Sequence, residues 1–158
     1  MAMSMNGQLP PLYIIAQNIR SLFNVGAIFR CADVFDVQRV YLCGYTGYPP
    51  RKEIAKVALG ADTWIPWEKQ WQTHLLVKKL KAQGVRIVAL ETGTDSTPLP
   101  AYQPRWPVAL VVGSEVGGIS KKILELADER IVIPMHGRKE SLNVAVATGI
   151  ALHHLRNK

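Results

Sequence analysis

The sequence predicts an α/β fold with a mostly parallel sheet flanked by helices. Segments of strand length alternate with segments of helical periodicity along the chain. Two strand candidates, ValAlaLeuValVal at 108–112 and IleValIle at 131–133, are apolar throughout, which is typical of strands buried on both faces. Each of these strands runs into a small polar loop. Because ligands of open α/β sheets bind at the carboxyl ends of strands, the two loops predict one binding crevice.

The first half of the chain contains two strands and one helix by its apolar pattern. An apolar run at 12–16 predicts the first strand. Apolar residues then recur at helical spacing from Asn24 to Phe35, with Asn24 suited to the N-cap. A second strand is expected at 40–43, and the loop that follows at 44–52 is too rich in glycine and proline for regular structure.

The second half of the chain continues the alternation of helices and strands. We expect a helix over 71–83 that ends at Gly84, a strand over 85–90, a strand over 108–112, a helix over 120–127, a strand over 130–133 and a final helix from about residue 141. The strand at 85–90 breaks into Glu91-Thr92-Gly93-Thr94-Asp95. This is a third polar loop at the carboxyl end of a strand.

The length indicates a single domain over residues 1–158, of which the first ten or so are expected to form a flexible tail. Hydrophobic residues make up 48% and charged residues 20%, which excludes a disordered chain and a coiled coil. Cys31 and Cys43 lack C-x-x-C spacing, and the chain begins without the pattern of a secretion signal. We therefore expect free thiols, a cytoplasmic location and no membrane partner.

The charge balance favours polyanionic partners. Nineteen Lys and Arg residues against twelve Asp and Glu residues leave a net charge of +7, which raises the local concentration of RNA or DNA. On charge alone, a basic protein without a nucleic-acid partner is an equal alternative. The four histidines lack metal-ligand spacing, and neither a Gly-x-Ser-x-Gly elbow nor a Cys/His constellation is present. We expect neither a metal site nor hydrolase chemistry.

Several residues carry either chemistry or a simpler structural role. The loop from Gly113 to Gly118 could receive a phosphate or an adenosine at the following helix, or could be a tight turn. Glu115 could stabilise a helix N-terminus or contact a ligand. Ser141 suits an N-cap, and Asn143 could bond locally. Arg30 lies off the apolar stripe of its helix. It could be an ordinary solvated arginine, or its guanidinium could donate paired hydrogen bonds to phosphate or ribose oxygens.

Three motifs, in this order and separation, resemble the SpoU/TrmH family of RNA ribose 2′-O-methyltransferases within the SPOUT superfamily. The first is matched by Asn18, Arg20, Asn24, Gly26 and Arg30. The second is Val112-Gly113-Ser114-Glu115-Val116-Gly117-Gly118-Ile119-Ser120, with Ser114 where asparagine is common in the family. The third runs from Ile133-Pro134-Met135 through Glu140-Ser141-Leu142-Asn143-Val144-Ala145. The resemblance covers residues from about Tyr13 to His154.

The resemblance implies a SPOUT-type fold with a deep C-terminal trefoil knot, S-adenosyl-L-methionine as the methyl donor, and a homodimer with the first-motif helix near its interface. The cofactor-binding residues that it implies are Leu90, Glu91, Thr92, Gly93, Gly113, Ser114, Glu115, Gly117, Ile133, Met135, Ser141, Leu142 and Asn143. These residues fall in the three loops that the strand pattern alone marks as a crevice.

The same resemblance implies five catalytic residues: Arg30, Asn24, Glu115, Ser141 and Asn143. The family assigns activation of the ribose hydroxyl to the arginine that matches Arg30. A free guanidinium is a poor base because its pKa exceeds about 12. We therefore expect Arg30 to orient the ribose or a phosphate and to stabilise negative charge, while Asn24 and Glu115 hold the arrangement.

The RNA itself is not identified by the sequence. Candidates for phosphate contacts are Arg20, Arg30, Arg51, Lys52, Lys56, Arg138 and Lys139. Transfer RNA is favoured over ribosomal RNA because the minimal members of the superfamily include transfer-RNA enzymes. A non-catalytic RNA-binding module with the same fold is the alternative. A nucleotide-dependent oxidoreductase is disfavoured, since Gln17-Asn18-Ile19-Arg20 follows the first strand in place of a glycine-rich turn.

Overall fold

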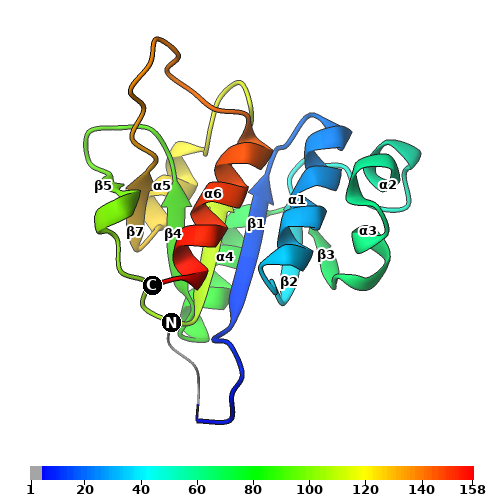
Figure 1. Ribbon diagram of the computed structural model, residues 1–158, viewed down its shortest axis with the longest axis horizontal. Helices are drawn as coiled ribbons and strands as arrows, with labels where there is room; N and C mark the ends of the chain where they lie inside the picture. Colours follow the sequence, from blue (N-terminus) through cyan, green and yellow to red (C-terminus); the bar gives the residue numbers. More distant parts are fainter. Residues whose placement is uncertain (1–4) are drawn as a thin grey trace.

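A computed structural model describes residues 5–158 as a seven-stranded sheet flanked by helices (Figure 1). The strand order is β3-β2-β1-β6-β4-β7-β5, and every strand pair in the described residues is parallel. The strands are β1 (Leu12–Gln17), β2 (Arg39–Cys43), β3 (Trp67–Gln70), β4 (Arg86–Leu90), β5 (Thr97–Pro98), β6 (Val108–Val112) and β7 (Glu129–Val132). The predicted α/β class with a parallel sheet is confirmed. The knot stays a prediction, and the predicted tail falls partly outside the described residues.

Helices cover both faces of the sheet. On one face lie α1 (Leu22–Val34) and α6 (Val144–Arg156), with the short α2 (Lys52–Ala58) and α3 (Ala61–Trp64) beside α1 (Figure 1). On the other face lie α4 (Thr73–Ala82) and α5 (Lys121–Leu126). A short 3₁₀ helix, η1 (Leu99–Ala101), follows β5. None of these helices is long and apolar enough to cross a membrane.

Two apolar cores, one on each face, explain why the central strands read as continuous apolar runs. All five residues of β6 are buried, with Leu110 facing the core under α1 and α6 and Val111 facing the core under α4 and α5. A side chain alternates between the faces of a strand, so a strand covered on both sides needs apolar residues at every position. This confirms the prediction that 108–112 is buried on both faces.

The sheet has a topological switch point at β1. This strand pairs with β2 on one side and with β6 on the other, and the helices that follow β1 and β6, α1 and α5, lie on opposite faces of the sheet. At such a point the loops after the two neighbouring strands separate and leave a crevice at their carboxyl ends. The loop between β1 and α1 carries the start of the first motif, the loop after β6 carries the second motif, and the two loops flank this crevice.

Two helix starts differ from their predicted positions. The cap of α1 is Ser21, whose hydroxyl accepts the N–H of Asn24 at 3.2 Å, so the prediction of Asn24 as the N-cap is wrong. The helix α6 begins at Val144 instead of near Ser141, because Asn143 caps it by accepting the N–H groups of Ala145 and Val146. Both changes leave a polar side chain, Asn24 or Ser141, available for other contacts.

The segment between residues 52 and 70 holds elements that the sequence pattern does not reveal. Two short helices, α2 and α3, are separated by Leu59 and Gly60, which both adopt left-handed backbone conformations. The edge strand β3 reads Trp-Glu-Lys-Gln, without an apolar run. Edge strands need fewer apolar residues than central strands, so their pattern is weak.

Candidate active site

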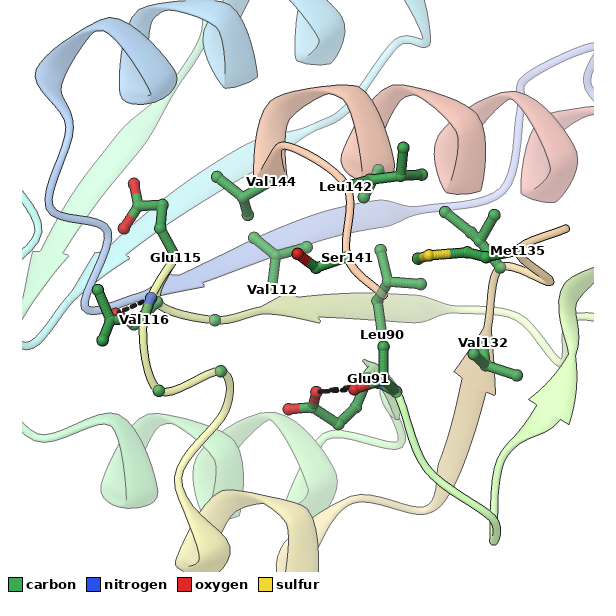
Figure 2. Close-up of a pocket in the computed structure, with 17 residues that line it drawn as sticks. Leu90, Glu91, Val112, Glu115, Val116, Val132, Met135, Ser141, Leu142 and Val144 are labelled. Carbon is green, nitrogen blue, oxygen red and sulfur yellow. Dashed lines mark hydrogen bonds between the residues drawn. The ribbon is translucent and has the colours of Figure 1, made fainter. Parts of the chain in front are cut away.

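A cavity of about 350 Å³ lies at the carboxyl ends of β4, β6 and β7, beneath the start of α6 (Figure 2). Its size falls in the range of small-molecule sites. The predicted cofactor residues that line it are Leu90, Glu91, Thr92, Gly113, Ser114, Glu115, Gly117, Ile133, Met135, Ser141 and Leu142. The structure therefore joins the three predicted loops in one cavity.

Two predicted cofactor residues, Gly93 and Asn143, do not line the cavity. Gly93 lies farther along the loop after β4, and the Asn143 side chain is turned toward α6 and α1. Conversely, the lining includes residues that were not among the predicted cofactor contacts, namely Val112, Val116, Gly118, Val132, Val144 and Ala147, of which Val132 and Ala147 also lie outside the three motifs. Val112 and Val132 are the last residues of their strands, so their position at a strand end is the sequence feature that indicates a place in the cavity lining.

The lining divides into an apolar part and a polar part. Leu90, Met135 and Leu142 contribute apolar side chains to the lining, and Ser141 contributes a hydroxyl group (Figure 2). Such a site suits a ligand that has a flat apolar portion and polar edges. Among residues 5–158 no three His, Cys, Asp or Glu side chains are grouped as ligands for a metal ion.

The second-motif loop needs its first glycine for steric reasons. The N–H of Ser114 donates to the Gly118 carbonyl at 3.1 Å, and the N–H of Gly118 donates back to Ser114 at 2.9 Å. A Cβ on Gly113 would stand 2.4 Å from backbone atoms of Gly118 and Ile119. The loop is therefore a tight turn as well as a cavity wall, and the two interpretations of it do not compete.

Glu91 ties the loop after β4 to the second-motif loop. Its carboxylate accepts the N–H of Ile119 at 2.9 Å and the N–H of Thr92 at 2.9 Å. The two loops belong to neighbouring strands of the sheet, β4 and β6. Glu91 thereby fixes the separation of two walls of the cavity, so it positions the site in addition to lining it.

Glu115 connects the second motif to the first. Figure 2 shows its side chain turned away from the middle of the cavity, toward the start of α1. There the carboxylate accepts the N–H groups of Arg20 at 3.0 Å and Ser21 at 3.2 Å, and the side-chain amide of Asn24 at 2.9 Å. Burial alone would raise the pKa of Glu115, but these hydrogen bonds outweigh it and hold the pKa below the ordinary value.

Asn24 extends this network to the third motif. Its side-chain oxygen accepts a hydrogen bond of 3.1 Å from the amide of Asn143, which also caps α6. One chain of hydrogen bonds thus runs from Asn143 through Asn24 to Glu115. The structure brings together three of the five residues predicted as catalytic, and a fourth, Ser141, lies two residues before Asn143 in the cavity wall.

Arg30, the fifth residue, does not line the cavity. It is exposed and lines a second groove of about 490 Å³ between α1 and α6, where the other lining residues are Ala27, Cys31, Val34, Phe35, Val57, Ala145, Val146, Gly149 and Ile150. Gly26 faces the interior, where a Cβ would stand 2.4 Å from the Ile54 carbonyl oxygen. Gly26 thus allows close packing of α1 on α2 within the chain.

The cations predicted to contact RNA are all exposed, and the six besides Arg30 come from three segments. Arg20 adjoins Glu115, Arg51 and Lys52 stand at the start of α2 with Lys56 farther along it, and Arg138 and Lys139 lie in the loop between β7 and α6. Arg20 also shares in the network, because its backbone N–H binds Glu115.

Comparisons with known proteins agree with the motifs. The family model described as the SpoU rRNA Methylase family matches residues 11–153. A tRNA (guanosine(18)-2′-O)-methyltransferase of Aquifex aeolicus is 34% identical over 93% of this chain and 69% of that protein. The enzyme of the same name from Escherichia coli K12 is 30% identical over 94% of this chain, which spans 64% of that protein's length.

A solved structure extends the comparison to three dimensions. The AdoMet-bound rRNA methyltransferase of Sinorhizobium meliloti superimposes with a TM-score of 0.88 and 29% identity, covering 95% of this chain and 57% of that one. The family match takes in all three motifs, the cavity that they line and the hydrogen-bond network that joins them. The chain belongs to the SpoU methylase family.

Proposed function

We propose that this protein transfers a methyl group from S-adenosylmethionine to a ribose 2′-hydroxyl of RNA, with transfer RNA as the favoured substrate. The observation that carries the proposal is the hydrogen-bond chain from Asn143 through Asn24 to Glu115. It holds the three family motifs together at one cavity of suitable size. Names of relatives support the RNA class, since the relatives from A. aeolicus and E. coli are both named as tRNA ribose methyltransferases.

The cavity residues suit S-adenosylmethionine by their chemistry. Leu90, Met135 and Leu142 offer apolar surface to an adenine ring, while the backbone of the loop that begins at Gly113 offers polar groups to its edges and to the ribose. When bound, S-adenosylmethionine would supply an electrophilic methyl group on a positively charged sulfur. The AdoMet-bound S. meliloti structure, which shares this fold, supports the same assignment.

The residues around the cavity have separable roles in this proposal. Ser141, whose hydroxyl lies within the cavity lining, would contact the reacting end of the ligands. Glu115, Asn24 and Asn143 would act as positioning residues, because their polar atoms are engaged with one another and with the backbone. Holding two reactants in line supplies much of the rate in a transfer of this kind.

Arg30 lines a groove that shares no residue with the cavity of its own chain, which favours a role for Arg30 in the cavity of a second copy. Its groove between α1 and α6 carries exposed apolar side chains, with Val34 68%, Val146 52% and Ile150 41% exposed. Contiguous apolar surface of this kind marks a protein contact. We propose a homodimer in which this face is covered by the partner and Arg30 serves the partner's cavity, where it orients the ribose or an adjacent phosphate.

Binding and transfer can be tested separately. Calorimetry should detect S-adenosylmethionine binding to the purified chain without RNA. Labelled methyl groups should then appear in transfer RNA, in dinucleotides that resist alkali, because a 2′-O-methyl group blocks alkaline cleavage of the adjoining phosphodiester. Label that is released in mononucleotides would indicate base methylation and refute the ribose assignment. Label confined to ribosomal RNA would refute the choice of transfer RNA.

A mixing experiment tests the shared site. An Arg30→Ala chain and a Gly113→Val chain, whose cavity wall is disrupted, should each be inactive alone. If Arg30 serves the partner's cavity, mixed dimers regain activity, because the intact cavity of the Arg30→Ala chain then receives Arg30 from the other chain. If mixed dimers form and stay inactive, Arg30 acts within its own subunit.

A further inference from the structure

An exposed aromatic surface stands beside the proposed active site and is not used by the proposed chemistry. It consists of Tyr45, Tyr48 and Trp71 around Lys69, and we call it the aromatic platform. Tyr45 is 58% exposed, Tyr48 42% and Trp71 69%. The tyrosines follow β2 and the tryptophan follows β3, so the platform occupies the same carboxyl edge of the sheet as the cavity.

Lys69 holds the platform in place. Its Nζ lies 4.3 Å from the centre of the Trp71 ring and 5.4 Å from that of Tyr48. The same ammonium group donates hydrogen bonds to the carbonyl oxygens of Gly44 and, at 2.7 Å, Thr46, on either side of Tyr45. A cation fixed under aromatic faces keeps the rings ordered before a ligand arrives, which reduces the entropic cost of binding.

The platform continues into the active site. The Tyr45 hydroxyl lies 3.5 Å from the Ser114 hydroxyl, and Ser114 lines the cavity. The backbone N–H of Tyr45 donates to the side chain of Asn18 at 3.1 Å, which anchors this end to the first-motif loop. At the other end, the exposed cations Arg51 and Lys52 follow Tyr48 after two prolines. An RNA strand that leaves the cavity would meet aromatic faces and then positive charge.

We infer that the aromatic platform stacks unpaired bases of the substrate RNA that neighbour the methylated nucleotide. The inference rests on the proposed function and narrows it to RNA that presents an unpaired segment. Bases within an A-form duplex have their faces covered by their neighbours, so exposed rings can reach only bases in loops, bulges or single strands. Stacking on aromatic side chains tolerates any sequence, because every base has a π face.

The test compares the shape of the side chain at position 71. Trp71→Phe keeps a flat ring, whereas Trp71→Leu keeps apolar volume without one. Trp64→Leu is the matched control, since Trp64 is 58% exposed on α3 and bonds to Asp33 of α1. The probes are a fluorescein-labelled single-stranded RNA of mixed sequence, the same strand with abasic central positions, and the strand annealed to its complement.

Trp71→Leu should weaken single-strand binding roughly 5- to 150-fold, while Trp71→Phe retains most of the affinity. Affinities for the abasic strand and the duplex should stay at the wild-type value in all three variants, and so should single-strand binding by Trp64→Leu. Equal losses on intact and abasic strands would overturn the inference. The inference would also be overturned if Trp71→Leu changed the mass measured by sedimentation and left RNA affinity unchanged, because the ring would then contact a second protein chain.

The proposed function can fail independently of this inference. If the wild-type chain neither binds S-adenosylmethionine nor transfers methyl groups, the proposed function is wrong, yet the affinity difference between intact and abasic strands remains measurable. If the Trp71→Leu chain binds and methylates RNA as well as the wild type does, the platform has no such role and the proposed function stands.

Discussion

Replacing Glu115 with glutamine tests whether the hydrogen-bond network positions the active site. Glutamine keeps one oxygen, which can continue to accept from Ser21 and Asn24, but it sets an amide N–H against the N–H of Arg20. One of three hydrogen bonds is lost, and the other two lose their charge. Since the carboxylate is partly solvated, we expect the free energy that favours the aligned arrangement of the loops to fall by ~1–2 kcal/mol.

That loss corresponds to a fall of roughly 5- to 30-fold in kcat/KM for methyl transfer. The dissociation constant of S-adenosylmethionine should change less, because Glu115 is turned away from the middle of the cavity (Figure 2). Glu125→Gln, which removes an exposed carboxylate from α5, should leave both quantities at their wild-type values. An unchanged kcat/KM in a folded Glu115→Gln chain would refute the positioning role.

The low pKa of Glu115 gives the same network a pH dependence. Hydrogen bonds from Arg20, Asn24 and Ser21 outweigh the effect of burial and lower this pKa below 4.5. A depressed pKa means that the carboxylate contributes stability above the unfolded-state value and that this contribution is lost as the pH falls through the folded-state value. The free energy of unfolding, measured as a function of pH, should therefore fall below pH 4.5, because the unfolded chain takes up a proton at Glu115. This part of the decrease should be absent from Glu115→Gln.

Three further outcomes follow from other parts of the structure. Gly113→Ala should abolish S-adenosylmethionine binding in calorimetry, because the new Cβ would stand 2.4 Å from the backbone of its own loop, whereas Gly137→Ala, with no atom within 4 Å, should bind normally. Arg156→Met should lower the free energy of unfolding in urea by ~3 kcal/mol, because Arg156 is only 5% exposed and its guanidinium donates to three backbone carbonyl groups that would lose their partners. Burial raises the pKa of Cys43 to about 12, so iodoacetamide at neutral pH should modify this thiol only after unfolding, as mass spectrometry of the native and denatured chain would reveal.

The sequence predicts the central strands of the sheet well, because each of them is marked by an apolar pattern within its own few residues. Strands such as β6 are covered on both faces, so they read as continuous apolar runs whatever their neighbours are. The three loops of the cavity follow from the same signal, since each begins where a strand ends. Edge strand β3 and the short helices α2 and α3 lack such a pattern, and their positions depend on packing between distant segments.

The network and the platform could not be predicted, because each depends on contacts between segments far apart in the chain. Asn24 and Asn143 are 119 residues apart, and only the packing of α6 beside α1 brings their amides together. Lys69 reaches the carbonyl groups at 44 and 46 because β3 pairs with β2 in a particular register. Residue types alone do not reveal which distant segments pack together. The sequence therefore identified Asn24, Glu115 and Asn143 without their hydrogen-bond partners, and it did not single out the residues of the platform.

Ser21 and Asn24 have different roles, which explains how one short segment both starts α1 and contributes to the active site. Both residue types are good N-caps, and they stand three positions apart. Ser21 takes the cap, which places Asn24 in the first turn of α1 with its side chain free of that duty. An amide can then donate to a carboxylate and accept from a second amide at once, as Asn24 does with Glu115 and Asn143. Aspartate would meet Glu115 as a like charge and alanine would break both links, so the joint between the three motifs depends on an amide at this position.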